Sequence, residues 1–547
     1  MKACIDIKAF ALNIQINNIG GVVLTKTKGY KVLVAALAFV LVLMLLSACS
    51  EDNNSGSNTN QGAEKNNASS VGNTAEELTL FIDAPWYPVK EWKGPITEKI
   101  TEKTGIKLKV TVATDDKQLP LMIASGDLPD LVFTYGNVSR LSDSKLSYPW
   151  NELIEKYAPD FKIDKTRIAI HTMDDGNFYT IRNAFATQEE WAANKYALGN
   201  NGNPGIAVRE DILKQLGNPP IKTLDDFVNV LGMVKDKYPD MVPLIMDKEW
   251  IEQYFLMQFG VDATFGSPWF EQGGKVDFFI RHQKMKDYFK FMNKLYRSGY
   301  IMAENFAHAN DKIDDQYATS GRAFAHMYTV SVADSDNAVV KREGGAFTFK
   351  MLPTSLSSDA KIISGGVGFA GTFITKKNKN PEKSIKLLQY LATDEGKKLT
   401  MFGIEGEHWT WNEEGYPNLK YDPNNGQFVE SNGIKWWYLY NDGITEGLWS
   451  YVPGTMTTQS LMEIKKITKY KPELGLIQAG PDSKERTMRT KIDEMIKNEK
   501  VKVYLAKSEE EAMANYENMV KNAEQLGLQK LVEWANETYQ KRKDLFK

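Results

Sequence analysis

The order of strand and helix signals near the start of the folded part constrains the fold more than any other feature. Strands are predicted over Leu78–Asp83, Ile106–Val112 and Leu131–Tyr135. Helices are predicted between Pro95 and Gly105 and over 119–124. Such a β-α-β-α-β order predicts parallel strands joined by right-handed crossovers. The pattern therefore predicts a sheet with helices packed against it.

A second run of alternating signals follows the break at 203–205. Strands are predicted over 206–208, 241–246 and 323–328, with amphipathic helices between them, and helices dominate from Pro381 onward. A chain of 547 residues is long enough for several cores. We predict an α/β protein with two lobes that face each other across a cleft, and with a helix-rich C-terminal third.

The carboxyl ends of the predicted strands carry aromatic and polar side chains. Ligands of open α/β sheets bind at these ends. The candidate ligand-binding residues are Trp86, Tyr87, Thr134, Tyr135, Asn137, Arg182, Asn183, His326 and Tyr328.

Tryptophan is concentrated late in the chain, where five of the twelve lie between residues 401 and 451. Burial in the core is one explanation for each of them. Their clustering in sequence rich in Gly, Asn and Pro favours loops, which carry binding residues on a rigid scaffold. Aromatic faces with polar edges suit sugar rings. Further candidates for ligand binding are Trp409, Trp411, Trp436 and Trp437.

Several other kinds of chemistry are disfavoured by the sequence. Gly366–Gly371 matches G-x-G-x-x-G, but strand sequence follows it where a dinucleotide site needs a helix. No histidine pair has metal-ligand spacing, and a net charge of −3 gives no basic excess for nucleic acid. We predict no cofactor and no metal. Glu405 and Glu407 keep a surface glycoside hydrolase or lyase open as an alternative.

The N-terminal region has the features of an export signal. Lysines precede fifteen apolar residues, Val32–Leu46, which is short for a membrane-spanning helix. Leu46–Cys49 resembles the lipobox of bacterial lipoproteins, which implies cleavage before Cys49 and acylation of its thiol. We expect 1–48 to be a lipoprotein signal peptide and 49–77 to be the lipidated cysteine and a disordered tether. The protein would then be anchored in the cell membrane and face the extracellular side.

Four further segments share a family resemblance. They are similar to extracellular solute-binding proteins of the sugar-binding family, and they comprise Ala124–Asp130, the stretch from Ala207 to Phe227, Met401–Trp409 and Asn518–Tyr539. The third segment is typical of their large Gram-positive lipoproteins.

This resemblance implies the type II fold of periplasmic binding proteins, with a hinge and an interlobe cleft. By analogy the lobes are discontinuous. The first would comprise 78–204 and about 328–370, and the second 205–327 and about 371–547.

The resemblance also implies a function. A saccharide would bind between the lobes, close them, and be delivered to the permease subunits of an ABC importer by a monomeric protein that is not an enzyme. Tyr135, Asn137 and Tyr328 match regions where the family contacts ligand, and the late tryptophans would form the opposite wall. A sensor that presents its ligand to a membrane kinase remains a second alternative.

Overall fold

The computed structural model describes residues 75–199, 202–247, 252–261, 267–308, 312–423, 425–480 and 482–546, which all belong to one compact unit, Asn73–Lys547. The predicted signal peptide, Cys49 and the tether up to residue 74 lie outside these ranges. None of the described helices combines the length and the apolarity needed to cross a bilayer.

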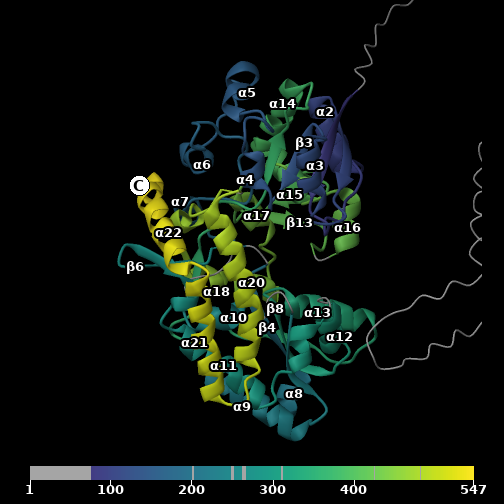
Figure 1. Cartoon of the computed structure of the whole chain (residues 1–547). Helices are drawn as coiled ribbons and strands as arrows, with labels where there is room; N and C mark the ends of the chain where they lie inside the picture. The colour runs from purple at the N-terminus through teal and green to yellow at the C-terminus, as the bar shows by residue number, and fades with distance from the viewer. Residues whose placement is uncertain are drawn as a thin grey trace, which may run out of the picture. The chain divides into compact units, whose positions relative to one another are not determined.

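The first lobe is built on a four-stranded sheet in the order β11-β3-β1-β2, of which Figure 1 labels β3. Its central strand β1 pairs in parallel with both neighbours, as the β-α-β-α-β pattern predicts, and β11 runs antiparallel to β3. Gly371 at the start of β11 therefore lies opposite Thr134 at the end of β3. The strands are β1 (Glu76–Asp83), β2 (Ile106–Val112), β3 (Leu131–Thr134) and β11 (Gly371–Ile374).

Local signals define the helices of this lobe. In α2 (Pro95–Thr104) a proline occupies the first turn, Ile96 and Ile100 face the core, and Gly105 ends the helix with a φ of 69°. The others are α3 (Gln118–Ser125), α4 (Val138–Leu141), α5 (Trp150–Tyr157), α6 (Lys165–His171), α7 (Gln188–Ala193), α14 (Pro381–Ala392), α15 (Asp394–Phe402), α16 (Gly426–Asn432) and α17 (Gly443–Trp449), with the hairpin β12 (Trp409–Trp411) and β13 (Pro417–Leu419).

The second lobe contains a mixed sheet in the order β5-β8-β4-β9. Strands β5 and β8 are parallel, whereas β4 runs antiparallel to both of its neighbours. The strands are β4 (Pro204–Arg209), β5 (Val242–Met246), β8 (Ala323–Thr329) and β9 (Phe349–Met351). Two further pairs are β6 (Trp269–Gln272) with β7 (Lys275–Phe278), and β10 (Ile362–Ser364) with β14 (Thr468–Tyr470).

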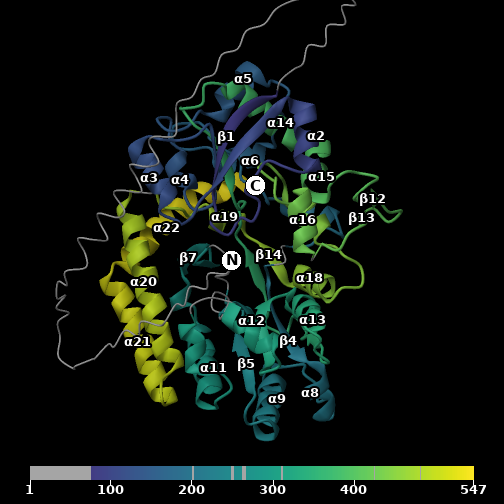
Figure 2. The ribbon, with the colours of Figure 1, turned by 90° about the vertical axis from the view of Figure 1, so that its right-hand side faces the viewer.

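Helices surround this second sheet, and the long C-terminal helices α20 and α21 lie beside α11 (Figure 2). Thr223 begins α9 with a reciprocal capping box that includes Asp226. The helices are α8 (Glu210–Gln215), α9 (Leu224–Lys237), α10 (Gln253–Gln258), η1 (Phe279–Arg281), α11 (Met285–Arg297), η2 (Ala303–Ala307), α12 (Lys312–Thr319), α13 (Val332–Arg342), α18 (Met456–Ile467), α19 (Pro472–Gly475), α20 (Lys484–Tyr504), α21 (Glu509–Gln525), α22 (Leu528–Arg542) and η3 (Lys543–Phe546).

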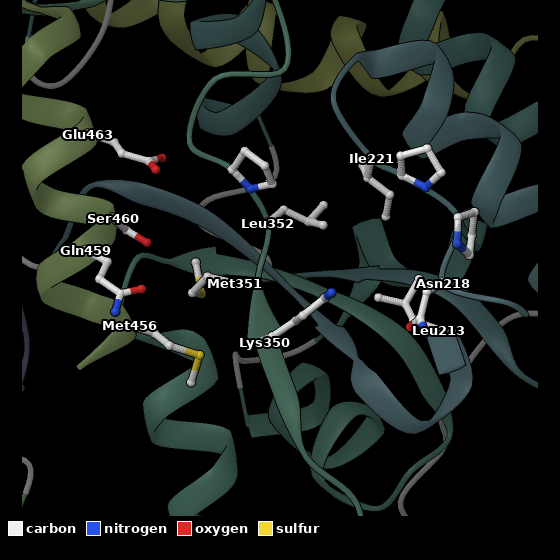
Figure 3. A pocket seen from close by; sticks show the side chains of 13 residues that line it. Leu213, Asn218, Ile221, Lys350, Met351, Leu352, Met456, Gln459, Ser460 and Glu463 are labelled. Carbon is white, nitrogen blue, oxygen red and sulfur yellow. The ribbon is translucent and has the colours of Figure 1, made fainter. Parts of the chain in front are cut away.

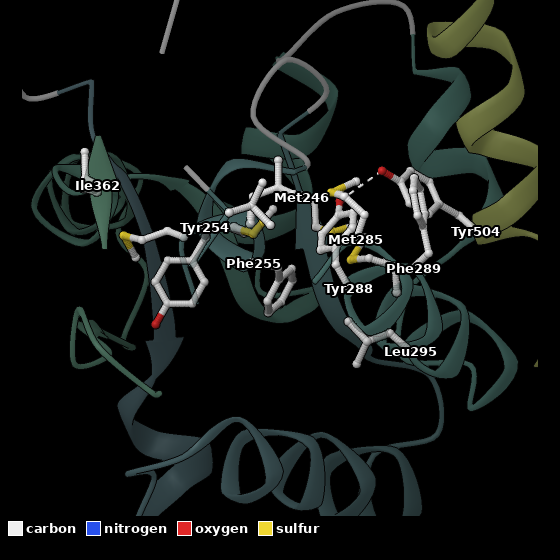
Figure 4. Packing of buried hydrophobic residues seen from close by; sticks show 14 of the residues in the cluster. Met246, Tyr254, Phe255, Met285, Tyr288, Phe289, Leu295, Ile362 and Tyr504 are labelled. Atoms are coloured by element: carbon white, nitrogen blue, oxygen red, sulfur yellow. Dashed lines mark hydrogen bonds between the residues drawn. The ribbon is translucent and has the colours of Figure 1, made fainter. Parts of the chain in front are cut away.

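Each lobe has its own hydrophobic core. In the second lobe, side chains of the sheet and of α9 to α11 pack with those of α20 to α22. Figure 4 shows Tyr288 and Tyr504 inside this core, where their hydroxyl oxygens lie 2.9 Å apart. In the first lobe, β1 to β3 pack with α14, α15 and the stretch 429–440. Both cores thus join segments that are distant in sequence.

The strand pairing corrects the expected lobe boundaries. Residues 328–370 were expected in the first lobe, but β9 pairs with β4 of the second. The chain after 371 was expected in the second lobe, but β11 pairs with β3 and α14 to α17 follow it in the first lobe. After β8 the chain adds β9 to the second sheet before it enters the first lobe at β11. It returns to the second lobe only after Trp449. Local patterns contain no signal for this extra exchange.

Candidate functional site

Three exposed aromatic side chains form a patch at the carboxyl ends of β1 and β3. Trp86 is 50% exposed, Tyr135 38% and Phe369 42%. The rings of Tyr135 and Phe369 stack with centroids 5.3 Å apart and an interplanar angle of 12°. The Trp86 ring lies 6.3 Å from the Tyr135 ring and 6.4 Å from the Phe369 ring. We call these three residues the aromatic patch.

A buried carboxylate at the end of β1 holds the base of the patch. Asp83 Oδ2 accepts hydrogen bonds from Thr134 Oγ1 at 2.6 Å and from Asn137 Nδ2 at 2.9 Å. Tyr135 lies between these two partners in the sequence, so the bonds fix the turn that presents its ring. The predicted site residues Thr134 and Asn137 thus have a demonstrable positioning contact.

A second aromatic layer packs against Trp86. The ring of Trp436 lies 6.5 Å from that of Trp86 and 5.4 Å from that of Tyr87, which is only 1% exposed. Trp437 is fully buried and meets Trp92 edge to face at 4.8 Å. Burial, with a smaller effect of Tyr438, raises the pKa of the Tyr87 phenol well above its ordinary value. This layer therefore supports the patch from inside the lobe.

Phe369 is the patch residue that the sequence analysis did not identify. It follows Gly368, whose φ is 103° and whose place leaves no room for a side chain, since an added Cβ would lie 2.5 Å from Arg182 Cβ. Asn183 holds the segment through its backbone and through Oδ1, which accepts from Ala370 N at 2.9 Å. The glycine-rich stretch thus serves close packing of backbone. The only signal for Phe369 in the sequence was an aromatic residue near the start of the strand expected over 368–375.

Arg182 lies beside this glycine-rich segment. It forms an isolated bridge with Gly371, and its guanidinium Nη2 donates to Gln478 Oε1 at 3.1 Å. Its backbone N–H donates to Nε2 of His171, whose Nδ1 lies 2.7 Å from the Arg167 carbonyl oxygen. Burial lowers the pKa of Arg182 to about 10, so the side chain stays charged at neutral pH.

The other two tryptophans predicted to bind ligand lie apart from the patch. Trp409 is 1% exposed, packs edge to face on Phe402, and donates from Nε1 to the Gly403 carbonyl at 2.9 Å. Trp411 is exposed on the β12-β13 hairpin, with Lys398 Nζ 5.1 Å from its ring. Of the four predicted tryptophans, the structure brings only Trp436 into ring contact with the patch, and Trp437 lies behind it against Tyr87 and Trp92.

The predicted residues of the second sheet form a separate group at the end of β8. His326 is fully buried, and its Nδ1 lies 2.9 Å from Asp336 Oδ2. Burial lowers the pKa of His326, but the carboxylates of Asp336, Asp315 and Asp247 together raise it above its ordinary value. The Tyr328 ring stacks on the imidazole at 6.3 Å with an angle of 15°. Of these two residues, His326 is buried and only Tyr328 is partly exposed to solvent.

A pocket of about 540 Å³ lies elsewhere in the second lobe (Figure 3). Side chains of α18, including Gln459 and Glu463, line one side, and Lys350 of β9 lies across from them. Glu463 Oε2 already accepts from Thr354 N at 2.9 Å. None of the predicted site residues lines this pocket. Across the described ranges, no group of three or more His, Cys, Asp or Glu side chains is arranged to hold a metal ion.

Comparison with known proteins defines the class of this fold and site. The family model of bacterial extracellular solute-binding proteins matches residues 85–398. The chain therefore belongs to the bacterial extracellular solute-binding proteins. Its two-lobe α/β architecture is the type II fold of periplasmic binding proteins.

Two relatives are similar in sequence. The fructooligosaccharide ABC transporter substrate-binding protein FusA of Streptococcus pneumoniae is 27% identical over 335 residues, which cover 56% of this chain and 59% of that protein. The chain thus spans less than two thirds of the length of this relative. Lipoprotein LipO of Bacillus subtilis is 22% identical over 452 residues, which cover 75% of this chain and 84% of LipO.

Two solved structures are similar in fold. The alginate-binding protein AlgQ2, without calcium ion, superposes with a TM-score of 0.64 at 19% identity, covering 87% of this chain and all of AlgQ2. FusA in complex with kestose gives a TM-score of 0.62 at 18% identity, covering 85% of this chain and 99% of FusA.

Proposed function

We propose that this protein captures an oligosaccharide on the aromatic patch and delivers it to the permease of an ABC importer. The observation that carries the proposal is the exposure of Trp86, Tyr135 and Phe369 together at the carboxyl ends of β1 and β3. Large aromatic side chains are normally buried, and a contiguous exposed group of them indicates an interaction site. Membership of the solute-binding family and the saccharide ligand in the name of FusA support the same conclusion.

The chemistry of the patch suits a saccharide. Sugar rings have C–H faces, which pack on aromatic rings, and hydroxyl rims, which need hydrogen bonds. The parallel rings of Tyr135 and Phe369 give one broad surface, and Trp86 is tilted 41° from the Tyr135 ring. A ligand seated here and also touching Tyr328 would bind the closed arrangement of the lobes more tightly than an open one. That difference in affinity would drive closure, which the permease would recognise.

The test is a binding measurement with a matched pair of variants. A thermal-shift screen of oligosaccharides identifies a ligand, and calorimetry then compares the wild type with Tyr135→Ala and Trp411→Ala. We expect Tyr135→Ala to weaken binding about tenfold or more, because a stacking surface is lost. Trp411 is a matched control, since it is comparably exposed but makes no ring contact with the patch. Equal losses in both variants would reject the patch as the site.

Two further measurements address the other functions. A hydrolase or lyase would shorten the oligosaccharide, so we expect chromatography to recover the ligand intact. A sensor would bind the ligand without being needed for its uptake, so we expect a deletion strain to lose transport of the labelled oligosaccharide.

We also propose that the protein is a monomer held at the outer face of the cell membrane by acylation of Cys49. Cys49→Ala should release it into the medium. Retention of that variant in the membrane fraction would contradict the lipid anchor.

A further inference from the structure

One cation next to the aromatic patch lacks a counter-charge. Arg182 bridges Gly371, and the residue after it, Asn183, accepts a hydrogen bond from the backbone of Phe369 at 3.0 Å. An added Cβ on Gly368 would lie 2.5 Å from Arg182 Cβ, so the base of the Arg182 side chain lies beside the residue that precedes Phe369. Its Nε is buried and has no hydrogen-bond partner within the described part of the chain.

The surroundings of Arg182 are neutral or positive. Its side chain donates a hydrogen bond to the amide oxygen of Gln478, whose side chain is exposed. Burial lowers the pKa of the nearby His171, and the positive charges of Arg182 and Arg167 lower that pKa as well. A guanidinium offers five N–H donors, and one neutral amide satisfies few of them.

Several other buried cations in the described residues are paired with a carboxylate, whereas Lys465 donates to the backbone carbonyls of Asn194 and Ala197 and Lys435 lies over the Trp449 ring. Each of four comparable side chains has a carboxylate within 4 Å. Such pairing is expected, because a buried charge without a partner is costly. These pairs are Arg167 with Glu190, Arg209 with Asp211, Lys397 with Asp442, and Lys471 with Glu271. Arg182 has no such partner among the residues described. A partly buried, unpaired guanidinium is a ready site for an anion.

We propose that Arg182 binds an oxyanion carried by the ligand, so that the natural ligand is an acidic oligosaccharide. This inference rests on the proposed function and specifies its ligand class. The patch would hold a sugar ring, and the guanidinium would donate hydrogen bonds to a uronate carboxylate or a sulfate ester next to that ring. The protein has 70 acidic and 67 basic side chains, so attraction of an anionic ligand needs a local cation.

The test uses pairs of oligosaccharides that differ only in charge. One pair is an oligogalacturonide and its methyl-esterified form, and the other is a sulfated oligosaccharide and its desulfated form. Calorimetry on the wild type should show that the acidic member of one pair binds at least about tenfold more tightly, the ratio that a charge-assisted hydrogen bond supplies. The pair that shows the preference distinguishes carboxylate from sulfate.

Two variants assign the preference to Arg182. Arg182→Gln keeps hydrogen-bond donors but removes the charge, and it should bind both members of the pair equally. Arg182→Lys should keep part of the preference. Thermal unfolding of both variants checks that they are folded. A preference that survives in Arg182→Gln would overturn the inference.

The outcomes separate this inference from the proposed function. Binding of neutral oligosaccharides alone, or equal affinity within each pair, would overturn the acidic ligand and leave saccharide capture intact. Failure of every oligosaccharide, neutral or acidic, to bind would overturn both.

Discussion

At the scale of single residues, Gly368 controls the position of Phe369. Its φ of 103° is unfavourable for any residue with a side chain, and an added Cβ would also lie 2.7 Å from the Asn183 carbonyl oxygen. We expect Gly368→Ala to lower the free energy of unfolding by about 1–3 kcal/mol and to weaken ligand binding. Urea denaturation and calorimetry measure the two effects.

Gly366 is the control for that substitution. It lies in the same segment, but nothing is within 4 Å of the Cβ that alanine would add. Gly366→Ala should leave the free energy of unfolding within about 0.5 kcal/mol of the wild type. Equal destabilisation by both substitutions would show that the close packing at Gly368 is not the cause.

His171 gives the first lobe a pH dependence. Burial lowers its pKa to about 3, and Arg182 and Arg167 act in the same direction. In the unfolded chain its pKa is about 6.5. Between these values only the unfolded state binds the proton, so the free energy of unfolding falls as the pH falls below about 6.5, by at most about 1.4 kcal/mol per unit.

Urea denaturation at several pH values tests this linkage. His171→Gln removes the titrating group, so the slope of stability against pH between 6.5 and 4.5 should flatten relative to the wild type. Identical slopes would mean that His171 does not titrate differently in the two states.

The residue scale is also where sequence reasoning is weakest for the site. The carboxyl ends of β1 and β3 were predicted, and with them Trp86 and Tyr135. Exposure was not predictable, because Tyr87 and Trp437 are as aromatic as their neighbours and yet are buried. Whether a ring is covered depends on segments distant in sequence, such as the one that carries Trp436.

At the scale of elements, the sequence predicted strands and helices well. β2 has the predicted bounds, and α2 begins at Pro95 and ends before Gly105 as expected. Caps, prolines and hydrophobic periodicity act within a few residues, so they can be read locally. β1 begins at Glu76 rather than Leu78, because its first residues pair with Ile106 and Lys107 although they are polar.

The end of α20 depends on a buried amide from α11. Asn293 is fully buried, and its Nδ2 donates to the carbonyl oxygens of Tyr504 at 3.1 Å and Ala506 at 2.7 Å. Alanine at this position would leave these acceptors without a donor. We expect Asn293→Ala to lower the free energy of unfolding by about 2–3 kcal/mol.

Asn515 provides the comparison. Its Nδ2 also donates to a carbonyl of α20, that of Lys502 at 3.2 Å, but this bond is exposed to solvent. Asn515→Ala should cost less than about 0.5 kcal/mol, because water replaces the donor. Urea denaturation of both variants measures the difference, and equal losses would contradict the role of burial.

At the scale of the whole molecule, each lobe is assembled from separated stretches of chain. The two-lobe α/β fold was predicted, but the expected lobe boundaries differ from the observed strand pairing, since pairing between distant segments leaves no periodic signal. The core of the first lobe includes Ile385, Leu388 and Trp437 in addition to the residues of β1 to β3.

Residues 75–199 should therefore not fold by themselves. We expect this fragment to lack a cooperative thermal transition and to bind a hydrophobic dye, because the apolar faces covered by α14 and α15 would be open to water. Calorimetry compares the fragment with the intact protein. A cooperative transition in the fragment would show that the first lobe is complete without its later segments.

The late arrival of β11 also sets an order of events during synthesis and export. A chain emerges with its N-terminus first, so Trp86 and Tyr135 are outside long before Phe369 and Trp436. Until Gly371–Ile374 follows, one edge of β3 has no partner and remains open to pairing with other chains. The aromatic patch is therefore assembled only when the chain is nearly complete, and the β3 edge stays unpaired until then.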